Sequence, residues 1–203
     1  SYLKRLWALL TGEKSSRDTK EEIEKILDEV EEKGIIDEDQ GDMIHNIIVL
    51  KDTMVHEIMV PKIDMVALEA SSSLDDLIEV FSREGCSRIP IYEENLDNII
   101  GVVHAKDVLK YWNVKDRPKD VRALMHPPYF VPEGKKLIDL LKEFREKRPK
   151  MAIVIDEYGN VDGLLTIGDV VEEIIGDIVG EDDAAGEEEI VEEGDGVYAV
   201  DPR

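Results

Sequence analysis

The stretches Gly101-Val-Val-His-Ala-Lys-Asp107 and Gly163-Leu-Leu-Thr-Ile-Gly-Asp169 decide how this chain folds, because they share one pattern 62 residues apart. In each, a glycine opens a short apolar run and an aspartate closes the stretch. The features upstream recur in the same order: a Met-x-Pro tripeptide (59–61 and 125–127), an amphipathic segment ending in phenylalanine (74–81 and 137–144) and a run around two isoleucines (87–91 and 151–155). The sequence therefore predicts two copies of one unit of about sixty residues.

A unit of this size has too little core to be stable alone. Domains of about sixty residues bury a smaller share of their surface than larger ones and are marginal in stability. Two such units packed face to face would bury a common core and leave a cleft between pseudo-symmetric halves. Clefts of that kind are favoured places for ligands.

Composition excludes several classes of protein. The 203 residues carry a net charge of −23, which disfavours nucleic-acid binding because Lys and Arg must replace the counterions of phosphates. The single cysteine, Cys86, excludes an internal disulfide and fits a reducing compartment. No run approaches the ~20 apolar residues of a membrane-spanning helix, and no signal-peptide pattern opens the sequence. We therefore expect a cytoplasmic location, or a peripheral one at the inner face of the cell membrane.

The segment before the first repeat has two predicted helices. Thr19-x-x-Glu22 has the spacing of a capping box for a helix that runs to about Lys33. A second helix is expected to start at Ile35-Ile36-Asp37, with apolar residues spaced for burial at Met43, Ile44, Ile47, Ile48 and Leu50. Residues 1–12 are amphipathic and are expected to engage a membrane surface or a protein partner. The two helices are equally well explained as a lever or docking element and as an extension that completes the core.

Each repeat is predicted to have the order strand, helix, strand, strand, helix, which makes the fold α+β. The expected elements of the first repeat are a strand at 65–68, a helix at 74–84 capped by Ser73, strands at 89–92 and 99–103 and a helix at 105–112. Those of the second are a strand at 129–131, a helix at 135–147, strands at 151–155 and 161–165 joined by Tyr158-Gly-Asn160, and a helix at 167–176. Pro90 predicts that its strand is an edge strand or is bulged.

The most informative candidate site is Thr166-x-x-Asp169, where an apolar strand gives way to a helix. The free backbone N–H groups of a helix start favour an anion such as a phosphate. A carboxylate one turn into the helix can accept hydrogen bonds from the vicinal hydroxyls of a ribose. The same spacing is also that of a capping box, which needs no ligand. Asp107 occupies the equivalent point of the first repeat.

The repeat, the Met-x-Pro openings, Ser-Arg-Ile-Pro-Ile-Tyr (87–92) and Gly-Leu-Leu-Thr-Ile-Gly-Asp-Val-Val-Glu-Glu-Ile-Ile-Gly (163–176) resemble a tandem CBS-domain pair. More narrowly, they resemble the pair of the CorC/HlyC family of magnesium and cobalt efflux proteins, also described as hemolysin-like. The resemblance covers about 20–178. It implies an N-terminal helical segment (1–52), a first CBS repeat (53–115), a second (116–179), and an acidic linker with the start of a transporter-associated domain that breaks off at Arg203 (180–203).

The resemblance also implies an adenine nucleotide, ATP or AMP, in the cleft, with any Mg²⁺ carried by the phosphates. Thr166 and Asp169 would hold phosphate and ribose, and Arg88 would pair with the phosphates. The remaining nucleotide-binding residues implied by the same motifs are Val60, Pro61, Ser87, Ile89 and Pro90. His104 stands where the first repeat would carry the threonine, so one nucleotide per pair is expected.

Neither a catalytic residue nor a protein-held metal is predicted. The four histidines, at 45, 56, 104 and 126, lack the spacing of a metal site, and no Cys pair exists. His104 is interpreted as a helix-start or packing residue, since no nucleophile adjoins it in sequence. The chain also lacks a glycine-rich phosphate loop with its lysine, which argues against ATP hydrolysis.

The main hypothesis is therefore a regulatory module that binds an adenine nucleotide and sets the state of an ion-efflux system. The alternatives are a structural dimerisation module with no nucleotide and an enzyme acting on nucleotides. A homodimer is expected, because each repeat has apolar helices on two of its sides, more than one contact within the chain should cover. These residues are Leu74, Leu77, Ile78, Phe81, Val170, Val171, Ile174 and Ile175.

Overall fold

The computed structural model describes residues 16–111, 114, 117–118, 120–176, 190–192 and 198–200. The amphipathic N-terminus (1–12) and most of the acidic run after residue 180 lie outside these residues. Across the described part, none of the helices combines the length and the apolar character needed to cross a membrane.

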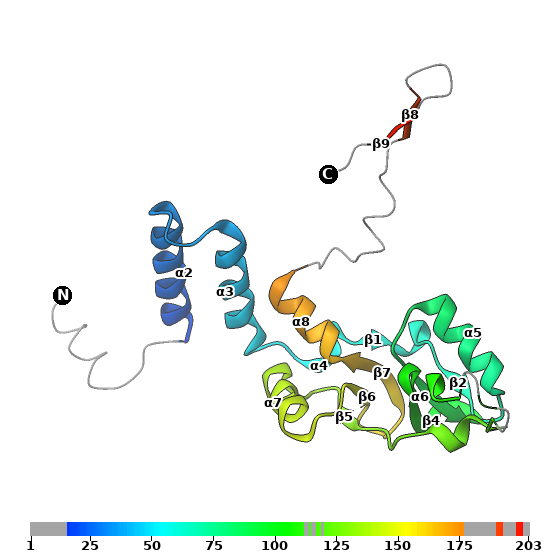
Figure 1. Cartoon of the computed structure of the whole chain (residues 1–203). Helices are drawn as coiled ribbons and strands as arrows, with labels where there is room; N and C mark the ends of the chain where they lie inside the picture. The colour runs from blue at the N-terminus through cyan, green and yellow to red at the C-terminus, as the bar shows by residue number, and fades with distance from the viewer. Residues whose placement is uncertain are drawn as a thin grey trace.

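The structure confirms two β-α-β-β-α units preceded by helices (Figure 1). The first unit comprises β2 (Leu68–Glu69), α5 (Leu74–Glu84), β3 (Arg88–Glu93), β4 (Asn95–His104) and α6 (Ala105–Leu109). The second comprises β5 (Phe130–Pro132), α7 (Leu137–Lys147), β6 (Met151–Ile155), β7 (Val161–Thr166) and α8 (Ile167–Ile175). The other elements are α2 (Ser16–Glu32), α3 (Glu38–Leu50), α4 (Val55–Ile58), β1 (Val60–Pro61), the 3₁₀ helices η1 (Lys62–Asp64) and η2 (Val121–Leu124), and the antiparallel pair β8 (Ile190–Glu192) and β9 (Tyr198–Val200).

Several predicted boundaries hold because local chemistry decides them. The Ser73 hydroxyl accepts from the Asp76 N–H and the Asp76 carboxylate accepts from the Ser73 N–H, which starts α5 where the sequence indicates. The β6–β7 hairpin turns at Gly159, whose φ of 89° suits glycine. The Asp156 carboxylate accepts from the backbone N–H groups of Tyr158 and Asn160 and closes that turn.

Helix α3 begins directly after Asp37, the last residue of its predicted start, and the Asp37 carboxylate accepts from the Gln40 N–H at 2.9 Å. Two other boundaries were predicted wrongly. Helix α2 begins at Ser16, so Thr19 lies inside the helix and does not cap it. The strand expected at 65–68 is reduced to β2, because residues 65–67 after η1 have no regular secondary structure.

Pro90 sits neither on an edge strand nor at a bulge, since β3 lies between β2 and β4 and its register shifts come after Ile91. Its partner Val102 uses its own N–H and C=O to bond His126 on the far side, at 2.9 Å each. Pro90 and Val102 therefore form a non-hydrogen-bonded pair, and the backbone nitrogen of Pro90 faces away from β4. Strand β2 begins opposite Ile91, so no ladder bond requires the missing N–H.

The segment that precedes each repeat pairs with the sheet of the other repeat. Strand β1, which precedes the first repeat, joins the second sheet as its edge, in the order β1-β7-β6-β5. Gly163 makes this approach possible, since a Cβ there would lie 2.3 Å from the carbonyl oxygen of Val60. The segment before the second repeat bonds in turn to β4 of the first sheet, through His126 and Val102. This reciprocal exchange follows the pseudo-symmetry of the two repeats.

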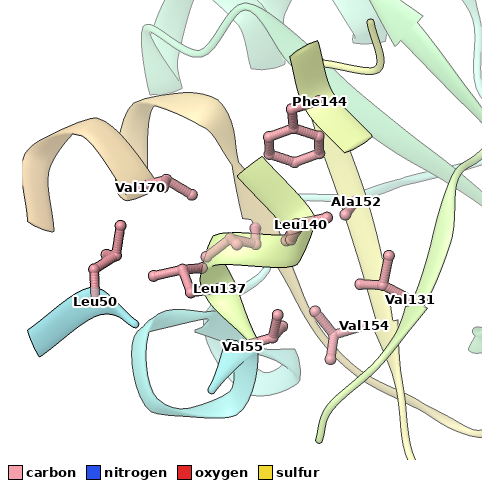
Figure 2. Close-up of a cluster of buried hydrophobic side chains, with 10 residues drawn as sticks. Leu50, Val55, Val131, Leu137, Leu140, Phe144, Ala152, Val154 and Val170 are labelled. Atoms are coloured by element: carbon pink, nitrogen blue, oxygen red, sulfur yellow. The ribbon is translucent and has the colours of Figure 1, made fainter. Parts of the chain in front are cut away.

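Three apolar clusters hold the fold together. The first repeat has its own cluster, which includes Leu77 of α5 and Ile89 of β3. Figure 2 shows the cluster of the second repeat, where Leu50 and Val55 from the preceding helices meet α7, α8 and the sheet. A third cluster joins the two repeats and confirms the predicted common core; its buried members are Ile99, Val102, Met151, Ile153, Val161 and Leu164.

The N-terminal helices complete the core at the end of α3, as one of the two interpretations requires. Leu50 at the end of α3 is 1% exposed and completes the second core. Earlier in α3, however, Ile44 and Ile47 are exposed although their spacing predicts burial. Helix α3 lies beside α8, and α2 packs on α3 and stands away from the two sheets (Figure 1). Ile175 on α8 is likewise exposed, whereas Leu77 and Val170 are buried within the chain.

Candidate functional site

The larger pocket lies where β1 meets β7 and where α8 begins. It has a volume of about 640 Å³, within the range of small-molecule sites. Its lining comes from three parts of the chain: Asn46 of α3, residues 57–61 with Asp64, and one face of α8 with Gly176. The pocket therefore touches the N-terminal helices, the leader of the first repeat and the second repeat at once.

The start of α8 is a complete capping box. The Thr166 hydroxyl accepts from the N–H groups of Gly168, at 3.2 Å, and of Asp169, at 3.4 Å. The Asp169 carboxylate accepts in return from the Thr166 N–H at 2.6 Å. These hydrogen bonds confirm that Thr166-x-x-Asp169 caps α8. It does not exclude a ligand, because Asp169 also lines the larger pocket and the cap holds its carboxylate there.

The lining of the larger pocket has an apolar side and an acidic side. Ile58, Met59, Val60 and Pro61 supply the apolar side, and the carboxylates are those of Glu57, Asp64, Asp169, Glu172 and Glu173. No Lys, Arg or His contributes to this lining among the described residues. The pocket accordingly suits a flat apolar group with hydroxyls to donate, and it repels an anion that arrives without a cation.

A second hollow, of about 160 Å³, has the opposite charge. Arg88, Arg148 and Lys150 line it together with His104, His126 and Met151. The Nε of Arg88 is buried and has no hydrogen-bond partner within the described structure. Burial lowers the pKa of Arg88, and burial followed by the nearby His126 and Arg88 lowers that of His104.

Asp107, the counterpart of Asp169, is engaged within the protein. It is 6% exposed; its Oδ1 accepts from Lys110 Nζ at 2.6 Å, and its Oδ2 lies 2.6 Å from His126 Nε2. The hydrogen bond from Lys110, and then the one from His126, lower the pKa of Asp107 to about 2. The carboxylate is therefore ionised at neutral pH and can only accept, so His126 Nε2 carries the proton. His104 is the N-cap of α6, as its interpretation as a helix-start residue requires.

The structure distributes the predicted nucleotide-binding residues unevenly. Val60, Pro61 and Asp169 line the larger pocket, and Thr166 adjoins them as the cap. Arg88 lines the smaller hollow instead.

The two hollows are nevertheless adjacent. Met151, which lines the smaller one, is the cross-strand partner of Thr166. Directly opposite residues of an antiparallel pair have Cα atoms about 4.5–5.5 Å apart. Arg88 and Met151 line the same hollow, so one cross-strand pair separates that hollow from Thr166 at the start of α8.

Three predicted residues line neither hollow. The side chain of Ile89 is fully buried in the core of the first repeat, and Pro90 beside it is also buried. Ser87 is exposed, and its carbonyl accepts from the Ala105 N–H.

Sequence reasoning missed most of the acidic lining. Glu172 and Glu173 follow Asp169 at three and four residues, the spacing that places side chains on one face of a helix, so this signal was available. Glu57 and Asp64 reach the pocket only because β1 crosses to the second sheet, which no local pattern shows.

Known proteins share this two-unit arrangement. The family model described as CBS domain matches residues 55–113 and 119–176. The chain is 42% identical over 166 residues to "Hemolysin C" of Brachyspira hyodysenteriae, covering 82% of this chain and 60% of that protein. It is 37% identical over 190 residues to "Magnesium and cobalt efflux protein CorC" of Vibrio cholerae, covering 94% of this chain and 64% of that protein. The chain spans less than two thirds of the length of both relatives.

Solved structures show the same relationship. The CBS domain of the bacterial CNNM/CorC family Mg²⁺ transporter is 45% identical, with a TM-score of 0.71, over 78% of this chain and 96% of that one. The same kind of domain solved in complex with ATP is 46% identical, with a TM-score of 0.65, over 68% of this chain and 99% of that one. A CBS-domain pair from Klebsiella pneumoniae with bound AMP is 28% identical, with a TM-score of 0.52, over 61% of this chain and 99% of that one.

Proposed function

This chain belongs to the CBS-domain family, as a tandem pair of the CNNM/CorC type, and from that premise we propose that it is a regulatory module that binds an adenine nucleotide. The larger pocket is its binding site, and the protein it regulates is a magnesium or cobalt efflux system. One observation carries the proposal: the apolar side of the pocket faces a carboxylate that the α8 capping box holds in place.

The pocket offers a separate contact to each part of a nucleotide. The apolar residues 58–61 can cover the face of an adenine ring. Asp169 can accept from the two ribose hydroxyls, because only one of its oxygens is used by the Thr166 N–H. The Thr166 hydroxyl accepts within the cap and keeps its own hydrogen to donate to a ligand oxygen.

The phosphates meet a different environment. The five carboxylates of the pocket oppose an unaccompanied triphosphate, so a divalent cation on the phosphates would improve binding. Arg88 can supply the protein's own positive charge from the adjacent hollow, where its Nε has no hydrogen-bond partner among the described residues. A planar guanidinium is well suited to phosphate oxygens. Nucleotide binding should therefore be stronger with Mg²⁺ than without it. The gain in affinity from Mg²⁺ should be larger for ATP than for AMP.

One nucleotide per pair follows from the contrast between the repeats. In the first repeat the carboxylate of Asp107 is bonded to both Lys110 and His126 and is 6% exposed. A ribose there would have to displace both partners. The equivalent carboxylate of Asp169 bonds a backbone N–H and faces a pocket.

Coupling to the rest of a transporter can run through α3. Asn46 lines the pocket, and its side-chain amide donates to the carbonyl of Ile174 at 3.3 Å. A nucleotide that favours one arrangement of α3 against α8 would shift the population toward it. In this proposal the chain works in the cytoplasm, at or near a membrane transporter.

The test is calorimetric titration of the full chain with ATP and with AMP, each with and without Mg²⁺. Asp169→Asn is the sharpest variant, because its amide oxygen can still accept from the Thr166 N–H while the charge on the ribose side is lost. We expect about tenfold to a hundredfold weaker binding, the loss of one or two charge-assisted hydrogen bonds. Asp139→Asn, at an exposed position on α7, is the matched control and should bind as the unaltered chain does.

The outcome also decides between two functions. A chain that binds neither nucleotide would be a structural dimerisation module, which the exposed Ile44, Ile47 and Ile175 favour independently. Equal affinities of the unaltered chain and Asp169→Asn would place any nucleotide elsewhere.

A further inference from the structure

The fold brings together two histidines and an aspartate that the sequence keeps apart. His104 ends β4, Asp107 lies in the first turn of α6, and His126 belongs to the segment that leads into the second repeat. Their potential ligand atoms all lie within 4.8 Å of one another. The backbone of His126 is held against β4 by two hydrogen bonds to Val102, each 2.9 Å long. The cluster is therefore part of the architecture rather than a chance meeting of surface side chains.

The three side chains are arranged around one carboxylate oxygen. The imidazole rings stack, with centroids 4.5 Å apart and planes 21° from parallel. Asp107 Oδ2 lies 2.6 Å from His126 Nε2 and 3.9 Å from His104 Nδ1. The Nδ1 of His104 is buried and has no hydrogen-bond partner within the described residues. Such a nitrogen is costly to leave unpaired, so its place in this cluster calls for a partner.

We propose that His104, Asp107 and His126 form a binding site for a divalent transition-metal ion of the zinc and cobalt class. Two imidazole nitrogens and one carboxylate oxygen are a common donor set for such ions, with water completing the shell. Mg²⁺ prefers oxygen ligands and keeps most of its waters, so this donor set discriminates against it. The site is separate from the nucleotide pocket and does not depend on the function proposed for that pocket.

The geometry requires only small side-chain movements. Ligand atoms bound to one ion at about 2.0–2.2 Å lie roughly 3–4 Å apart, against a present maximum of 4.8 Å. His126 is 49% exposed in its side chain and can tilt out of the stack, so that its Nε2 and His104 Nδ1 converge on the ion. The proton on His126 Nε2 moves to its Nδ1 or to water as the ion binds. Lys110 bonds only the Oδ1 of Asp107 and would orient the carboxylate from behind while Oδ2 binds the metal.

Neighbouring cations oppose the ion and limit its affinity. Arg88, Arg148 and Lys150 line the same hollow, and their positive charges disfavour a further cation. We therefore expect weaker binding than at a four-ligand structural zinc site. An ion bound here would tie the end of β4 to the leader of the second repeat, and so would stiffen the junction between the repeats.

The experiment uses the untagged chain, titrated with Co²⁺ while visible absorption is recorded, and then with Zn²⁺ as competitor. We expect the bands of a nitrogen-ligated Co²⁺ of low coordination number, saturating at one ion per chain and persisting in a large excess of Mg²⁺. His126→Ala and His104→Ala should each weaken Zn²⁺ binding at least tenfold. The matched control is His45→Ala, because His45 is exposed on α3, and it should bind as the unaltered chain does.

Circular dichroism of each variant separates loss of a ligand from loss of the fold, and His126→Gln provides a polar replacement if His126→Ala is unstable. Unchanged Zn²⁺ affinity in a folded His126 variant would overturn the proposal, since the ion would then be held by the acidic surface. A spectrum of hydrated Co²⁺ in the unaltered chain would overturn it as well.

Discussion

Replacing Gly163 with alanine tests the crossing of β1 to the second sheet, on which both the fold and the pocket depend. A Cβ at this position would lie 2.3 Å from the carbonyl oxygen of Val60 and 3.0 Å from the sulfur of Met59. The sulfur belongs to a flexible side chain and can move. The carbonyl oxygen belongs to the backbone of β1, which pairs with β7 at Val60–Leu164 and Pro61–Gly163. The methyl group can therefore be accommodated only if β1 moves away.

The expected cost follows from the nature of the obstacle. Inserting a methyl group into a well-packed region costs about 1–3 kcal/mol, and a backbone obstacle places this case in the upper half of that range. Val60 and Pro61 also line the nucleotide pocket, so a displaced β1 should weaken ATP binding about tenfold, which equals about 1.4 kcal/mol. The free energy of unfolding is measured by urea denaturation, and the affinity by calorimetric titration with ATP and Mg²⁺.

Two other glycines serve as controls. A methyl group at Gly134 would have no atom within 4 Å, so Gly134→Ala should leave stability within about 0.5 kcal/mol of the unaltered chain. Gly101 is the counterpart of Gly163 in the first repeat, but the three atoms nearest to its methyl all belong to the side chain of Met125 and not to backbone, so Gly101→Ala should cost less than Gly163→Ala. If Gly163→Ala were as stable as Gly134→Ala, the close approach of β1 and the argument built on it would be refuted.

Three further outcomes are expected. The ionised carboxylate of Asp107 stabilises the fold above the ordinary carboxyl pKa of 3.8, and this contribution is lost as the pH falls toward about 2. The difference in free energy of unfolding between the unaltered chain and Asp107→Asn should therefore shrink below pH 4. A difference that stays constant in urea denaturation down to pH 3 would contradict the lowered pKa of Asp107. Ser73→Ala should destabilise the chain by about 1 kcal/mol through loss of the α5 cap, and an unchanged urea midpoint would show that the cap contributes nothing. Light scattering at micromolar concentration should give the mass of a homodimer that hides exposed apolar residues such as Ile175, and a strictly monomeric mass would remove that prediction.

Local patterns were sufficient for most elements. The start of α5 at Ser73 and the β6–β7 hairpin at Gly159 were predictable, because a cap and a turn are decided by residues a few positions apart. The wrongly predicted start of α2 also came from a local pattern. Thr19 and Glu22 have the spacing of a capping box, but α2 begins three residues before Thr19, so that spacing alone does not mark a helix start.

The candidate site was predictable only in part. Asp169, Val60 and Pro61 were found from motifs and do line one pocket. Arg88 was grouped with them because sequence cannot show that its strand faces the other hollow. Ile89 was expected at the ligand, yet successive residues of a strand face opposite sides, and its side chain is in the core.

By itself the sequence determined the two-unit architecture, since an internal repeat is visible without any structure and implies its own pseudo-symmetry. Only the tertiary structure decided which side chains meet. The acidic lining contributed by Glu57, and the cluster of His104 with His126, arise because each leader crosses to the opposite sheet. Contacts of that kind depend on how two sheets pack, and no local sequence pattern predicts contacts between residues that are far apart in sequence.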